Sequence, residues 1–120
     1  MNVQDYLMQI KDIDLRIRSL EGELHDSCAE EDAGYADELR DRIEADIERC
    51  KEIRIRIRDQ IQQLRDNRSV ILLTEYYVRG KSWEQVAAAL DLKSVKNVRE
   101  GLHNKALEQF SKKFEKYLEI

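Results

Sequence analysis

Apolar residues near the start of the chain recur at alternating steps of three and four, which is the spacing of a heptad seam along a helix. The seam consists of Ile10, Ile13, Ile17, Leu20 and Leu24, with Val3 and Tyr6 extending it toward the N-terminus. Asn2 precedes it, and its side chain can accept a hydrogen bond from the free amides of a first helical turn. The pattern predicts a long amphipathic helix that begins near residue 2.

A second seam follows after a polar break, the stretch HDSCAEEDAG. Its members are Ala36, Leu39, Ile43, Ile47, Cys50, Ile53, Ile57, Ile61 and Leu64. Two amphipathic helices joined by a short polar loop predict an antiparallel helical hairpin over residues 1–67. Leu15 and Ile55 lie off both seams and widen the apolar face. They either pack under the C-terminal helices or form a surface for homodimerisation. We favour homodimerisation, because an isolated hairpin would leave them poorly covered.

A third helix is expected from Arg68 to Arg79, and it holds too many apolar residues for one narrow stripe. Gly80 follows as a C′ residue that can take a positive φ. Ser82 and Gln85 have the spacing of a capping box, which predicts a short helix from Trp83 to Leu90. Asp91, Leu92 and Lys93 form a break with Leu92 pointing inward, and Ser94 is the expected cap of a final helix.

The final helix has a predicted buried face made of Val95, Val98, Leu102, Ala106 and Phe110. The alanines at 87–89 keep the preceding helix slim, so the two helices can cross closely. Residues 68–120 therefore predict a helix-turn-helix module, and the chain as a whole an all-α fold. Phe114, Tyr117 and Leu118 are expected to extend the last helix and pack on the hairpin. A second partner surface is the alternative.

The charge is divided unevenly along the chain. Residues 1–67 carry 11 Lys and Arg against 18 Asp and Glu, a formal charge of −7, whereas residues 68–120 carry 10 against 7, or +3. Residues 20–48 alone carry −10. Such asymmetry indicates two roles, with the C-terminal part facing an anionic partner. A solvated helical surface is the alternative that charge alone leaves open.

The exposed side of the final helix is expected to read double-stranded DNA. Side chains of this kind pair with base edges in the major groove, and basic or hydroxyl groups hold phosphates. The expected base contacts are Lys96, Asn97, Glu100 and Asn104, and the expected backbone contacts are Lys81, Lys93, Ser94, Arg99 and His103, with Arg79 and Lys105 beside them. A merely polar helix face is the alternative.

The stretches ILLTEYYVRGKSWEQVAAALDL and VREGLHNKALEQF resemble region four of bacterial sigma factors, a helix-turn-helix that reads the −35 promoter element. The resemblance covers about residues 70–110. Asp91 stands where a glycine is common, and the gap from Leu92 to Val98 is one residue longer than in many relatives. That gap leaves two registers of the recognition helix open. An acidic hairpin replaces the upstream regions of a sigma factor, a layout similar to small phage and prophage regulators.

The resemblance implies transcriptional control, with RNA polymerase as a second partner. The alternative is a protein-interaction module that binds RNA polymerase or a sigma factor without reading DNA. No motif predicts an enzyme, a catalytic residue or a cofactor. His25 and Cys28 lie in a polar loop that lacks the four ligands of a structural zinc site, so we expect no metal. The absence of an apolar run long enough for a membrane span, and of a secretory signal, favours the cytoplasm.

Overall fold

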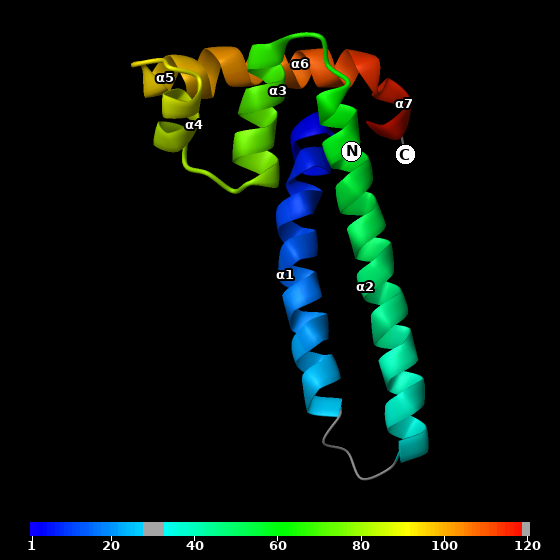
Figure 1. The fold of residues 1–120 in the computed structure, drawn as a ribbon. Helices are drawn as coiled ribbons and strands as arrows, with labels where there is room; N and C mark the ends of the chain where they lie inside the picture. Colours follow the sequence, from blue (N-terminus) through cyan, green and yellow to red (C-terminus); the bar gives the residue numbers. More distant parts are fainter. Residues whose placement is uncertain (28–32, 119–120) are drawn as a thin grey trace.

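The computed structural model describes residues 1–27 and 33–118, and this part of the chain is all-α, without strands (Figure 1). The elements in chain order are α1 (Val3–Ser27), α2 (Ala33–Gln62), α3 (Asn67–Leu73), η1 (Thr74–Val78), α4 (Trp83–Ala89), α5 (Val95–Asn97), η2 (Val98–Leu102), α6 (His103–Lys113) and α7 (Glu115–Leu118). The labels η1 and η2 denote single π-helical turns. The predicted long hairpin followed by a helix-turn-helix is confirmed.

The hairpin is formed by α1 and α2, which run antiparallel and bury the predicted seam between them (Figure 1). Its own core holds Ile13, Ile17, Ile43, Ile47 and Cys50. The Asn2 side chain accepts from the Asp5 amide at 2.7 Å, so the predicted N-cap is confirmed. Leu15 and Ile55 remain 54% and 56% exposed, and they therefore do not pack under the C-terminal helices. Homodimerisation through the hairpin stays a prediction.

A larger core lies where the open end of the hairpin meets the C-terminal helices. Its fully buried members are Leu7 and Ile10 of α1, Ile57 and Ile61 of α2, and Leu72, Leu73, Val86, Val98, Ala106 and Phe110. Burying an aliphatic or aromatic side chain of this size stabilises a fold by about 1.5–3 kcal/mol. Because one core draws on both parts of the chain, the hairpin and the module are packed together. The predicted division at residue 67 stays a prediction, and it falls at the start of α3.

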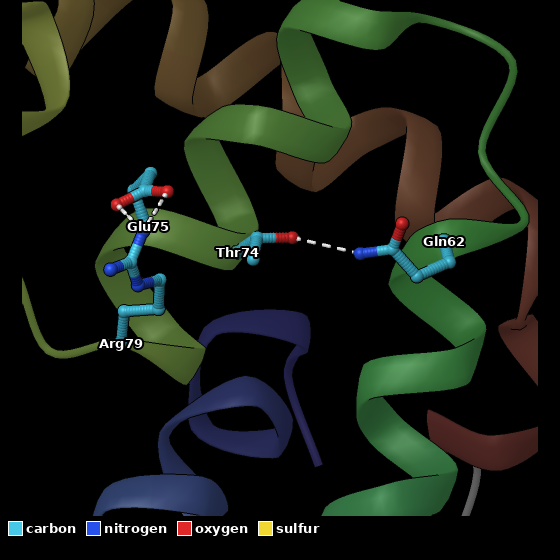
Figure 2. Close-up of polar contacts among 4 residues, drawn as sticks. All are labelled: Gln62, Thr74, Glu75 and Arg79. Carbon is cyan, nitrogen blue, oxygen red and sulfur yellow. Dashed lines mark hydrogen bonds and ion pairs between the residues drawn. The ribbon is translucent and has the colours of Figure 1, made fainter. Parts of the chain in front are cut away.

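Polar contacts tie the two parts together at the same place. The amide of Gln62, the last residue of α2, donates to the Thr74 hydroxyl at 3.2 Å (Figure 2). Asp66 caps α3 by accepting from the Arg68 amide at 3.0 Å, and it also accepts from the Gln109 side chain of α6 at 3.3 Å. These contacts connect the end of α2 to η1 and the start of α3 to α6.

The C-terminal tail differs in part from the prediction. The last long helix ends at Lys113, because Phe114 leaves the helical conformation with φ −118° and ψ 33°, and α7 follows as a separate turn. Phe114 and Leu118 are buried in the larger core, as expected, whereas Tyr117 stays exposed. The amino group of Met1 donates to the Leu118 carbonyl at 2.9 Å, which holds the two ends of the described chain side by side.

The molecule is elongated, with extents of 57 × 31 × 19 Å. The C-terminal end of α1 and the N-terminal end of α2, which carry most of the acidic stretch 20–48, lie at one end (Figure 1). The helix formed by α5, η2 and α6 crosses the other end. The acidic end of the hairpin therefore points away from the candidate recognition helix.

Candidate nucleic-acid interface

Local capping signals shape the helix-turn-helix as predicted. Gly80 adopts a φ of +67° and lets the chain turn after η1. Ser82 and Gln85 form the expected capping box at the start of α4. Asp91 takes a φ of +56° in the turn, a conformation that aspartate tolerates better than most residues. The Ser94 side chain accepts from the Asn97 amide at 3.2 Å and so begins the second helix.

An aromatic cluster packs α4 against η1 and the start of α6. Its members are Tyr76, Tyr77, Trp83 and His103. Tyr76 and Trp83 stack with ring centroids 3.9 Å apart and planes 14° from parallel. The ring centroids of Trp83 and His103 lie 4.7 Å apart, with the two planes at 62°. The Tyr77 hydroxyl lies 2.6 Å from Nε2 of His103, and both side chains are buried. The cluster thus connects η1, α4 and the start of α6, and it holds the recognition helix at a set angle.

The second helix of the motif runs continuously from Val95 to Lys113 through the π turn η2. Val98, Ala106 and Phe110 are fully buried on its inner face. The predicted base-reading residues Lys96, Asn97, Glu100 and Asn104 are all exposed. The predicted backbone contacts Lys93, Ser94 and Arg99 are also exposed, at the N-terminal end of the same helix. The structure therefore places five of these seven residues on the second helix and the other two, Lys93 and Ser94, directly before its first turn.

The placement of His103 on that exposed surface was wrong. His103 is only 6% exposed, because η2 contains one residue more per turn than an α-helix and rotates the next residue inward. The His103 amide bonds to the Val98 carbonyl, five residues earlier, which is the signature of this turn. Burial lowers the pKa of His103, although a hydrogen bond to the backbone of Arg99 raises it in part. A buried neutral imidazole offers no contact to a phosphate.

Arg79 and Lys81 follow η1, in the turn that leads to α4. Arg79 pairs with Glu75 at 3.0 Å within the π turn (Figure 2). Lys81 is half-buried. Both residues line a groove against α1 whose lining includes neither Lys96 nor Asn97.

Two side chains on the exposed face are engaged within the helix. Asn104 donates from its amide to the Glu100 carbonyl at 2.6 Å, and Arg99 lies 3.8 Å from the Glu100 carboxylate. Both contacts are on the surface, and a surface ion pair such as Arg99–Glu100 contributes about 0–1 kcal/mol. The side chains can therefore exchange these contacts for others on a bound partner.

Gly101 is a residue of this face that the sequence pattern did not single out. It is exposed in η2, one position after Glu100. A Cβ placed on it would have no neighbour within 4 Å. Glycine weakens a helix by about 0.5–1 kcal/mol relative to alanine. A glycine inside a predicted helix is therefore the feature by which the sequence could have singled out Gly101.

A groove of about 430 Å³ lies between α1 and the turn that follows η1. Lys11 and Arg18 line it from α1, Lys81 lines it from the turn, and the exposed Leu15 supplies apolar surface. The one acidic residue that lines it, Asp14, is already bonded to Arg54 at 2.6 Å. The groove is thus cationic with an apolar component.

Within residues 1–27 and 33–118, no group of three or more His, Cys, Asp or Glu side chains is arranged to hold a metal ion. His25 is exposed at the end of α1, and Cys28 lies outside the described residues. Among the described helices, none is both long and apolar enough to cross a bilayer. Comparison of the chain with protein-family models, with curated proteins and with solved structures finds no match.

Proposed function

We propose that this protein is a sequence-specific, double-stranded-DNA-binding transcriptional regulator whose second motif helix, residues 95–113, enters the major groove. The proposal rests on one observation. The second helix of the helix-turn-helix packs against the module along its inner face, and its outer face is polar and exposed. A second helix that packs against its module along one side and exposes the other side is the form in which such motifs meet DNA.

The chemistry of the exposed residues fits base recognition. Asn97 and Asn104 can each pair with an adenine edge, Lys96 with a guanine, and Glu100 with the amino group of a cytosine. Lys93, Ser94 and Arg99 are suited to phosphates beside them. The acidic end of the hairpin lies at the opposite end of the molecule, where it does not oppose the approach of the DNA (Figure 1).

The resemblance to sigma region four supports a promoter as the target and RNA polymerase as a partner in a phage-type regulator. We propose that the hairpin serves homodimerisation or holds a protein partner. Leu15 and Ile55 are more than half exposed, which leaves both side chains available for such a contact.

The test is selection of bound sequences from a pool of random duplexes at two salt concentrations. We expect one motif to be enriched, with the logarithm of affinity falling by about 0.9 per phosphate contact for each tenfold rise in salt. Lys96→Glu with Arg99→Glu should abolish the enrichment. Arg16→Glu with Arg42→Glu, two exposed hairpin residues, makes the same change of net charge and should leave the motif unchanged. Equal loss in both pairs would argue against readout by this helix.

A protein-interaction module that binds RNA polymerase or a sigma factor without reading DNA is the second candidate. The cationic groove beside α1 favours it, because an acidic segment with an apolar anchor matches Lys11, Arg18 and Leu15. Here Lys11→Glu with Arg18→Glu should prevent capture of purified RNA polymerase, whereas Lys96→Glu with Arg99→Glu should not. The opposite pattern would assign the contact to the recognition helix.

A further inference from the structure

Gly101 occupies a position at which neither the backbone nor the packing requires glycine. Among the described glycines, a positive φ occurs at Gly80 and not at Gly101. An added Cβ at Gly101 would meet nothing within 4 Å, so no neighbouring helix needs the space. The free protein therefore gives no structural reason for glycine at this position, and the same holds for Gly22 of the hairpin.

Gly101 differs from Gly22 in its surroundings, because it lies among the residues that we assign to DNA recognition. Asn97 is four residues earlier and Lys105 four residues later, and all three residues are exposed on the outer side of the same helix. Glu100 and Asn104 are also exposed and lie in the adjacent row, on one side of this line. Gly101 therefore has no side chain at a position surrounded by long polar side chains. It lies about halfway along the surface to which we assign DNA recognition.

We propose that Gly101 is the point of closest approach between the helix and the floor of the DNA major groove. This inference rests on the proposed function. Without a side chain at 101 the backbone of η2 can lie directly against base edges. The neighbouring Asn97, Glu100 and Asn104 then reach their bases at hydrogen-bonding distance. A side chain at this position would lift the helix and weaken all three contacts together.

The proposal makes stability and binding change in opposite directions. Gly101→Ala and Gly101→Met should raise the thermal unfolding midpoint by roughly 2–5 °C, because alanine and methionine are better helix formers. The same variants should bind the selected DNA motif more weakly, about fivefold for alanine and more than twentyfold for methionine, by the geometric argument above. Removing one good base contact weakens binding by a comparable factor.

Gly22 supplies the matched control. It is also exposed within a helix, and a Cβ there would meet nothing within 4 Å, but it lies in α1 on the hairpin. Gly22→Ala and Gly22→Met should therefore raise the unfolding midpoint in the same way and leave DNA affinity unchanged. The emission of Trp83, whose ring touches His103, reports whether the motif keeps its fold in each variant.

The outcomes separate the inference from the proposed function. If the wild type enriches a motif and Gly101→Met, with unchanged Trp83 emission, binds it as tightly as Gly22→Met, the close approach at Gly101 is refuted and DNA recognition stands. If the wild type enriches no motif, the proposed function fails and the inference fails with it. A Gly101→Met protein with altered Trp83 emission would also refute the inference, since it would show that glycine serves the fold.

Discussion

The hydrogen bond between Tyr77 and His103 is expected to set the stability of the recognition module. The imidazole also bonds to the backbone of Arg99, one turn earlier. Because the ring nitrogen that faces Arg99 donates, Nε2 of the neutral ring is the acceptor for the Tyr77 hydroxyl at 2.6 Å. Tyr77→Phe keeps the ring and removes that donor. It leaves Nε2 buried among aromatic side chains without a partner.

The size of the effect follows from burial. Leaving a buried acceptor unsatisfied costs about 1–3 kcal/mol, and Tyr77 and His103 are 4% and 6% exposed. With a urea dependence of about 1–3 kcal/mol per molar, the unfolding midpoint should fall by roughly 1 M. Tyr117→Phe removes the same hydroxyl from an exposed ring, so its effect should stay within about 0.5 kcal/mol.

The same pair makes stability depend on pH. Burial lowers the pKa of His103 below its ordinary value of 6.5, so the unfolded chain binds a proton more readily than the folded one. The contribution of His103 is therefore fully present above pH 6.5. It declines as the pH falls through 6.5 toward the lowered folded pKa, and it is constant below that value. His103→Leu removes the titrating group and this part of the pH dependence.

Urea unfolding followed by Trp83 fluorescence at pH 7.5 and 5.5 measures both effects. The wild type should lose more stability than His103→Leu between the two pH values. An equal loss in the two proteins would refute the assignment of a buried neutral imidazole. A Tyr77→Phe protein as stable as Tyr117→Phe would show that the hydroxyl contributes nothing.

Three further changes test the elements that position the helix. Asp66→Ala removes the cap of α3 and its bond to Gln109, and should lower the free energy of unfolding in urea by about 1–2 kcal/mol. Gly80→Ala forces a Cβ into a left-handed conformation, and calorimetry should show a loss of about 1–2 kcal/mol. Phe110→Ala empties the centre of the larger core, and a loss of about 3–5 kcal/mol is expected in urea. A loss below 1 kcal/mol for Phe110→Ala would contradict the packing described here.

Much of the fold was predictable from the sequence because its signals are local. The heptad steps of the two hairpin helices, the caps at Ser82 and Ser94, and the glycine at 80 each act within one or two turns, and all are confirmed. The outward exposure of Lys96, Asn97, Glu100 and Asn104 was likewise predictable from helical periodicity. Lys96 and Asn97 precede the π turn, Glu100 lies inside it and Asn104 follows it, and all four are exposed.

The tertiary structure decided what periodicity could not. No local sequence pattern indicates that residues 98–102 form a π turn. The turn directs the side chain of His103 toward Tyr77 and Trp83, which belong to other elements of the motif. The π turn therefore buries His103 and determines which residues of α6 face the core. Three other features also depend on packing between segments that are far apart in the chain. They are the break at Phe114, the core shared by hairpin and module, and the lack of a covering element over Leu15 and Ile55. A helix period assigns each residue to a face, but only packing between helices determines which face is covered and where the period is interrupted.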